Sequence, residues 1–192
     1  KDNTIPKDPL HEDAEVTYDI PSSRPLREDL QTALSVIGRR GDDRMALERR
    51  QNPPFQPDLQ GAHLDEAQLF RAKIGPALLN GSSWLNASLR RCDFSGSTAY
   101  DGCDFRAAEL EGTDFSNSFL SEVKFEFSNL SEVNFQGANL HQIDFSQRDF
   151  SFVSFADGKI AGCAFDDTNF FETNFDGCSI FDVSLTNASL FG

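Results

Sequence analysis

Large apolar residues recur at every fifth position along most of the chain. Written in fives from Leu59, the pattern places Leu, Phe or Ile at 25 of 27 such positions, with one extra residue between Phe94 and Tyr100. A small residue or Val stands two positions earlier in 24 of the 27 units. Residues two apart in an extended chain point to the same side. Each unit therefore offers two side chains to a common interior, and stability must come from stacking units on one another.

The composition of large residues is strongly biased toward one type. The chain holds 19 Phe but only one Trp, two Tyr and one Met. A bias this strong indicates that one interior position is filled by the same residue type again and again. We expect nine of these side chains to form an inward ladder in the core: Phe94, Phe105, Phe115, Phe125, Phe135, Phe145, Phe155, Phe165 and Phe175.

Units such as Cys103-Asp104-Phe105 and Ala138-Asn139-Leu140 resemble the pentapeptide-repeat family, and the resemblance covers about residues 57–191. It implies an all-β solenoid, specifically a right-handed quadrilateral β-helix with four units in each coil. The 27 units would then form about 6–7 coils, or a rod about 32 Å long at the usual spacing of strands.

The residues before the repeat carry a helix signal. Ser23 is a candidate N-cap, and Glu28 and Asp29 would lie in the first turn. The apolar residues that share one face of this helix are Leu26, Leu30, Ala33, Leu34 and Ile37. A solenoid exposes apolar residues and unpaired strand edges at its first coil. We therefore expect a short N-terminal α-helical cap.

The chain divides into four parts on this interpretation. Residues 1–22 are an irregular N-terminal segment, 23–40 the capping helix, 41–56 a linker and 57–192 the repeat.

Residues 29–40 are similar to the segment before the repeats in bacterial membrane-anchored pentapeptide-repeat proteins. This resemblance implies the cytoplasmic part of a tethered protein. No apolar run approaches the roughly 18 residues that a membrane helix needs, so we expect no membrane contact by this segment itself.

The net charge of −14 lies almost entirely in the repeat. Residues 1–54 hold eleven acidic and nine basic side chains, a net charge of −2, whereas residues 55–192 hold twenty and eight, a net charge of −12. An acidic body repels phosphates, so direct binding of nucleic acid is not expected.

Catalytic, cofactor-binding and metal sites are not expected either. Each of the four cysteines occupies the small inward position of its unit, where free Cys packs as a small hydrophobe. The three histidines are scattered along the chain without converging partners. The sequence therefore favours a protein that is not an enzyme and needs no cofactor.

Two departures from the pattern are candidate functional features. Arg148 occupies an inward position, and a guanidinium must swing out of a core or pair inside it with a carboxylate. Phe152, Phe171 and Phe191 point outward near one end of the rod. Clustered apolar exposure of this kind indicates a contact surface.

The leading function is a non-catalytic scaffold or interaction module with an unidentified protein partner. A weak homodimer through the C-terminal end, or docking there of a segment outside this sequence, is also expected. The alternative is an acidic mimic of DNA that binds DNA gyrase, as in the quinolone-resistance branch of the family. The charge of the repeat favours this alternative, whereas the resemblance of residues 29–40 points to a different branch.

Overall fold

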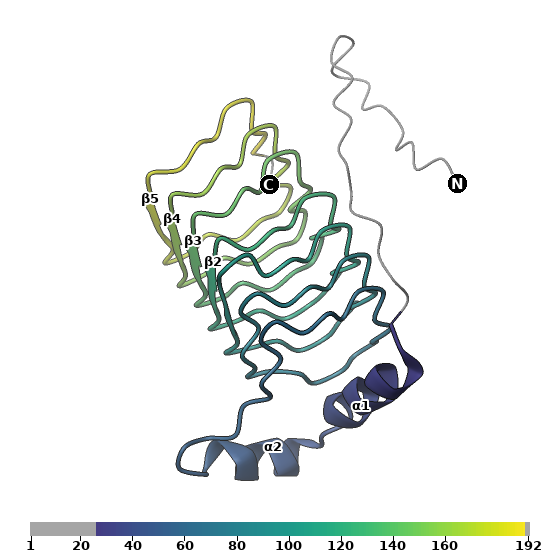
Figure 1. The fold of residues 1–192 in the computed structure, drawn as a ribbon. Coiled ribbons are helices and arrows are strands. Elements are labelled where there is room, and N and C mark those ends of the chain that lie inside the picture. Colours follow the sequence, from purple (N-terminus) through teal and green to yellow (C-terminus); the bar gives the residue numbers. More distant parts are fainter. Residues whose placement is uncertain (1–25, 191–192) are drawn as a thin grey trace, which may run out of the picture.

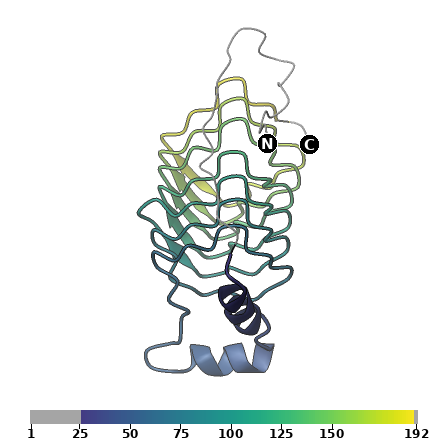
Figure 2. The ribbon, with the colours of Figure 1, turned by 45° about the vertical axis from the view of Figure 1, so that its right-hand side comes forward.

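The computed structural model describes residues 26–190, which form a rod of stacked coils with two helices at its N-terminal end (Figure 1). Parallel bridges join residues about one coil apart, from Asp58 at the first coil to Ser189 at the last. The first two coils are joined on four sides, by the pairs Asp58–Leu78, His63–Ser83, Gln68–Ser88 and Lys73–Asp93. Figure 2 shows the repeated outline of the coils along the rod.

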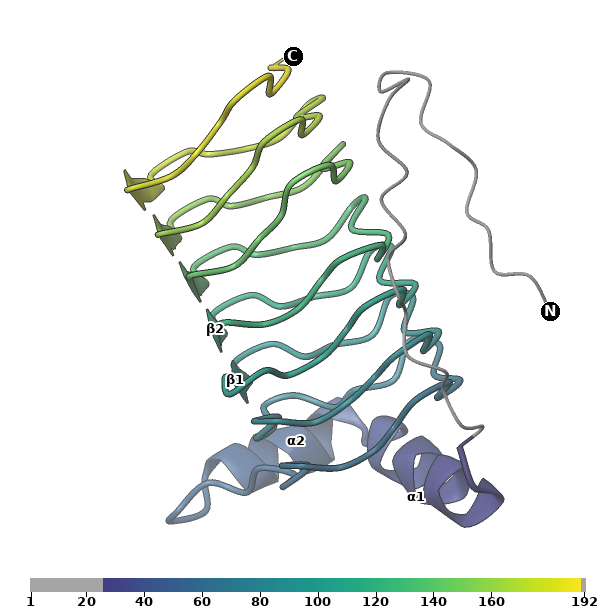
Figure 3. The same ribbon diagram turned by 45° about the horizontal axis from the view of Figure 1, so that its top comes forward.

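One side of the rod is regular enough to form a parallel sheet. Its five strands lie in chain order and are one coil apart: β1 (Thr98–Ala99), β2 (Phe119–Ser121), β3 (Asn139–His141), β4 (Lys159–Ala161) and β5 (Ser179–Phe181). Leu120, Leu140, Ile160 and Ile180 face one another in register. Figure 3 shows these strands as a single row that runs away from the helices.

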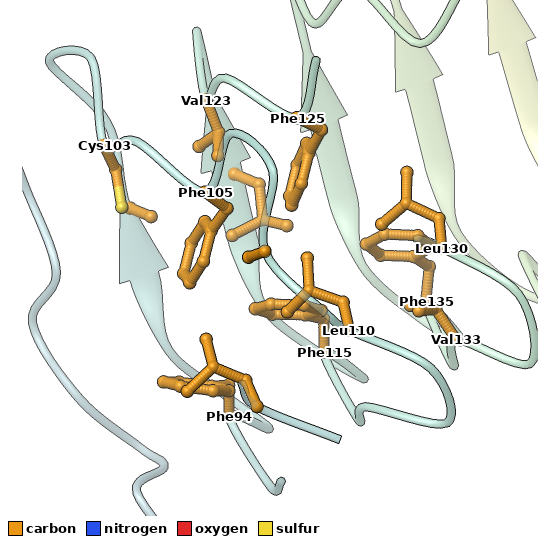
Figure 4. Packing of buried hydrophobic residues seen from close by; sticks show 14 of the residues in the cluster. Phe94, Cys103, Phe105, Leu110, Phe115, Val123, Phe125, Leu130, Val133 and Phe135 are labelled. Carbon is orange, nitrogen blue, oxygen red and sulfur yellow. The ribbon is translucent and has the colours of Figure 1, made fainter. Parts of the chain in front are cut away.

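The ladder residues form two columns of stacked rings inside the rod (Figure 4). In one column Phe94, Phe115, Phe135 and Phe155 follow one another with ring centroids 5.4, 5.7 and 5.4 Å apart and nearly parallel planes. Neighbouring columns meet edge to face. The ladder residues from Phe94 to Phe165 are buried, whereas Phe175 is half-buried because little of the chain lies beyond it.

The frame of the repeat differs from the prediction at one coil. Ala99, not Tyr100, occupies the interior position between Leu79 and Leu120, and Tyr100 is 39% exposed. The extra residue therefore lies in the turn after Ala99. A Tyr side chain carries a hydroxyl that would need a hydrogen-bond partner in this apolar core, so its outward placement is the cheaper arrangement.

The N-terminal cap also differs from the prediction in its bounds. Helix α1 runs over Glu28–Gly38 with Arg27 at its N-cap, and the predicted cap residue Ser23 and segment 1–22 lie outside the described residues. The predicted linker 41–56 contains a second helix, α2 (Asp42–Arg49). Acidic residues in its first turn favour this helix, and Met45 gives it a buried contact.

Helix α1 takes the place of a coil before the first one. Leu34 is buried in the same core as the ladder residues. The side-chain amide of Gln31 donates to the carbonyl of Gln68 at 2.7 Å and accepts from its N–H at 2.9 Å. The N–H of Lys73 donates to the carbonyl of Gly38 at 2.8 Å. These bonds close part of a strand edge that would otherwise be open to pairing.

A buried arginine completes this closure. One terminal nitrogen of Arg40 donates to the carbonyls of Lys73 and Ile74 at 2.9 and 2.8 Å, and the other forms an ion pair with Glu48 of α2 at 2.9 Å. The side chains of Arg40 and Glu48 are only 9% and 6% exposed. The pair therefore ties both helices to the first coil. The sequence pattern marked Arg40 only as the end of a helix.

Candidate functional site

An aromatic patch, Phe152 and Phe171, lies on the outside of the rod toward its C-terminal end. The two side chains are 53% and 40% exposed, and their rings meet edge to face with centroids 5.5 Å apart. They belong to the side of the rod whose interior holds Phe150 and Phe170, which stack at 5.8 Å. The third predicted member, Phe191, lies outside the described residues.

The backbone at Phe152 has the conformation that the repeat adopts at this position, as at Arg91, Glu132 and Glu172 on the same side of the rod. Its φ is 62°, in the left-handed region where a bulky residue costs about 1–2 kcal/mol relative to glycine. Gly112, two coils earlier on the same side, is in the same conformation with φ 67°. The left-handed backbone at Phe152 therefore belongs to the turn of the repeat and is not particular to its aromatic side chain.

The end of the rod beyond the patch is also apolar. Four further large side chains near it are exposed: Ile180, Phe181, Leu185 and Leu190. Ile180, Leu185 and Leu190 stand at the inward position of their units. The equivalent residues in earlier coils, such as Leu140 and Phe145, are buried. Their exposure follows from position, because in the described chain no further coil covers them.

Arg148 leaves the core and lies against the outside of the rod. Its side chain is half-buried, its guanidinium carbon lies 5.5 Å from the ring centroid of Phe127, and its Nε donates to the carbonyl of Ser146 at 3.1 Å. The inward position is thus vacated, and the charge rests on an aromatic face. Of the two arrangements that the sequence allowed, the structure has the outward one.

Comparison with protein families identifies the repeat. Residues 108–147 match the family model described as pentapeptide repeats, in eight copies. Residues 108–147 of this chain are pentapeptide repeats. The predicted family is thereby confirmed, and members of this family fold as right-handed quadrilateral β-helices. The further resemblance of residues 29–40 to membrane-anchored members stays a prediction.

Solved structures of pentapeptide-repeat proteins are similar at low sequence identity. HetL, involved in heterocyst differentiation regulation in the cyanobacterium Nostoc, is 22% identical over 71% of this chain and 60% of its own, with a TM-score of 0.37. QnrB1, a plasmid-mediated fluoroquinolone resistance protein, is 13% identical over 71% of this chain and 85% of its own, with a TM-score of 0.39. A protein of the Arabidopsis thaliana thylakoid lumen is 22% identical over 54% of this chain and 61% of its own, with a TM-score of 0.28.

These TM-scores are low, so the assignment rests on the repeat itself. No curated protein matches the chain.

The four cysteines lie where the five-residue pattern places them. Cys92, Cys103 and Cys163 are buried, Cys178 is half-buried, and all four are free thiols. Burial raises the pKa of Cys92 to about 11 and that of Cys103 to about 12. It also raises the pKa of Cys163 and Cys178. The thiolate, which is the reactive form, is therefore disfavoured in the folded protein.

Alkylation should follow this difference in burial. At pH 8 we expect iodoacetamide to modify Cys178 first and to leave Cys92 and Cys103 intact, because at a pKa of about 11 roughly one thiol in a thousand is ionised. Mass spectrometry of the native and urea-unfolded protein checks this. In urea all four should react. Modification of Cys103 in the native protein as fast as Cys178 would contradict the assigned interior.

One contact between a serine and a histidine lies on the sheet side of the described rod. Ser121 and His141 lie on neighbouring strands, with Oγ 3.3 Å from Nδ1, but the next residue along this row is Ala161. Within residues 26–190 no group of His, Cys, Asp or Glu side chains could hold a metal ion. In the same range no helix has the length and apolarity to cross a membrane.

Proposed function

We propose that this pentapeptide-repeat protein is a non-catalytic scaffold that binds another protein through the C-terminal part of the rod. The observation that carries the proposal is the exposed pair of Phe152 and Phe171, which touch each other and belong to different coils. Paired aromatic side chains on a surface are typical anchors of protein interfaces. Leu190 lies further along the same side of the rod and is 69% exposed, whereas Ile180 and Phe181 belong to β5 on another side.

The charge around the patch selects the kind of partner. Residues 94–190 carry sixteen acidic and four basic side chains. An interface with a hydrophobic centre and an acidic rim fits a partner whose rim is basic, because opposite potentials guide the encounter and like charges oppose it. The partner is therefore expected to present an apolar pocket bordered by Lys or Arg.

Removing the two rings should abolish capture of this partner. The protein is immobilised and exposed to an extract of its native host, and the bound proteins are identified by mass spectrometry. We expect a specific partner on the wild type that is lost with the double variant Phe152→Ser and Phe171→Ser. The matched control is Phe119→Ser, because Phe119 is similarly exposed, at 43%, on another side of the rod. Equal capture by the wild type and the double variant would disprove the role of the patch.

Mimicry of DNA is the second candidate. The observation in its favour is the net charge of −12 over residues 94–190, spread along a straight row of coils. An acidic rod can occupy a site built for duplex DNA, since such sites are lined by Lys and Arg. A gyrase supercoiling assay separates the two candidates: inhibition by the wild type and by the double variant alike would favour mimicry, because the charges are unchanged.

The weak homodimer through the C-terminal end stays a prediction. The exposed side chains of Ile180 and Leu185, at inward positions of the last described coil, favour this dimer. Asp176 and Asp182 of the same end would repel a second copy, so association should strengthen with salt.

A further inference from the structure

The net charge differs between the two ends of the rod. Residues 26–93, which form the helices and the first coils, carry ten basic and nine acidic side chains, a net charge of +1. Residues 94–190 carry four basic and sixteen acidic side chains, a net charge of −12. The N-terminal end is thus the part of the described chain that can attract an acidic group.

A groove of about 500 Å³ opens at this end, between the last turn of α1 and the first coil. Its lining includes Gly38, Arg39, Leu69, Phe70, Arg71 and Lys73. Phe70 is 64% exposed, and the guanidinium of Arg71 lies 5.1 Å from the centroid of its ring. Arg39 is exposed at the other wall. The groove therefore combines an apolar surface with two exposed guanidinium groups.

Arg39 and Arg71 are not neutralised by carboxylates of the described residues. Among residues 26–190 neither forms an ion pair, whereas Lys73 of the same groove pairs with Asp42. Arg90, in the next coil, shows what an arginine on this side of the rod binds. One of its terminal nitrogens contacts both carboxylate oxygens of Glu111 at 2.8 Å. Guanidinium groups bind carboxylates strongly in this way.

One backbone carbonyl of the groove, that of Phe70, has no donor among the described residues. In later coils the carbonyl at the position of Phe70 accepts a hydrogen bond from the preceding coil. The N–H of Arg71 donates to Arg90 at 3.2 Å, and the N–H of Arg91 donates to Glu111 at 3.0 Å. Among the described residues no coil precedes the first one, and α1 takes its place at Gln68 and Lys73. No residue among 26–190 donates to the carbonyl of Phe70.

We propose that this groove binds an extended acidic peptide segment of a partner protein. Carboxylates of the segment pair with Arg39 and Arg71, one of its apolar side chains packs on Phe70, and a backbone N–H donates to the carbonyl of Phe70. The segment thereby occupies part of the space of a missing coil, as in other cases where a peptide extends an open strand edge. A lipid surface fits less well, because a flat bilayer offers no backbone donor and cannot enter the groove.

The proposal rests on the proposed function only in that the partner is a protein. The aromatic patch lies toward the opposite end of the rod, so Phe152→Ser and Phe171→Ser should leave peptide binding at the groove unchanged. Loss of the groove interaction and loss of the patch interaction are thus separate results.

Fluorescence anisotropy with a labelled peptide of alternating Glu and Val tests the proposal. A peptide of about six residues spans about 20 Å when extended. We expect the double variant Arg39→Ala and Arg71→Ala to bind it at least about tenfold more weakly than the wild type, since charge-assisted hydrogen bonds are lost. The control is Arg49→Ala with Arg50→Ala, which removes the same charge from exposed positions outside the groove lining. We expect the control to bind within about twofold of the wild type.

Two further probes test the backbone contact and the class of ligand. Two further peptides of the same sequence carry N-methyl groups on alternate backbone nitrogens, one form at the Glu residues and the other at the Val residues. One of the two forms should bind about tenfold more weakly than the parent peptide, because its methyl groups remove the N–H that donates to the carbonyl of Phe70. Equal loss in both arginine double variants would show diffuse electrostatic attraction and overturn the proposal. So would equal affinity for both N-methylated forms and the parent peptide. Vesicles rich in phosphatidylserine that compete with the peptide would assign the groove to a membrane instead.

Discussion

Replacing Arg40 by alanine is expected to lower the free energy of unfolding by about 3–5 kcal/mol, the usual loss when one partner of a buried ion pair is removed. Glu48 would remain buried with only the exposed Arg44 beside it. The carbonyls of Lys73 and Ile74 would also lose their donor at the edge of the first coil. Urea unfolding followed by circular dichroism measures this loss.

Arg49→Ala is the matched control for Arg40→Ala. Arg49 is the last residue of α2 and is exposed, and it forms no ion pair among residues 26–190. Its replacement should change the stability by less than about 0.5 kcal/mol. If the two variants unfold at the same urea concentration, the helices do not stabilise the first coil and α1 is not a cap.

Phe135→Ala is expected to cost about 3–5 kcal/mol, as for other large-to-small changes of a core Phe. Phe135 is fully buried, and its ring lies between those of Phe115 and Phe155 at 5.7 and 5.4 Å. The rings of Phe125 and Phe145 meet it edge to face. The rigid backbone of the neighbouring coils leaves little freedom to close the resulting cavity. Urea unfolding again gives the magnitude.

Ser131→Ala serves as the control in the neighbouring unit. The hydroxyl of Ser131 lies on the outside and donates to the side chain of Asn129 at 2.8 Å. Its loss should change stability by less than about 0.5 kcal/mol. Similar losses for Phe135→Ala and Ser131→Ala would mean that inward and outward positions have been exchanged.

The repeat could be predicted from the sequence because each unit repeats the same local requirement. A small and a large apolar residue two positions apart face one interior, so the burial of residues such as Phe94 and Phe135 follows from their place in the unit. The break in the frame could not be placed in this way. The five-residue pattern alone allows either Ala99 or Tyr100 at the interior position. Only the pairing of Ala99 with Leu120 in the parallel sheet decides between them.

The contacts of the cap were beyond the sequence because they join residues that no local period relates. Gln31 binds Gln68 and Arg40 binds Lys73, across more than thirty residues. Helix α2 is hard to predict from the sequence because only three of its eight residues, Met45, Ala46 and Leu47, are apolar. Its stability comes instead from the buried Met45 and from the ion pair of Glu48.

The outward placement of Phe152 and Phe171 could be read from their positions in the unit, but the contact between their rings could not. The same holds for Arg148. Its inward position signalled a conflict between burial and charge, and the ring of Phe127, one coil away, resolves that conflict. A contact between outward residues of adjacent coils cannot be predicted from the five-residue period, because the period specifies only which residues point inward.

The closure of the first coil by α1 gives the molecule a direction in which it can form during synthesis. Each coil contacts mainly the coil made about twenty residues before it, as the bridge from Asp58 to Leu78 shows. Helix α1 leaves the ribosome ahead of the first coil and can seal its edge as soon as that coil is complete. Each later coil can then pair with a coil that is already folded. The growing chain therefore exposes at most one unpaired strand edge at a time.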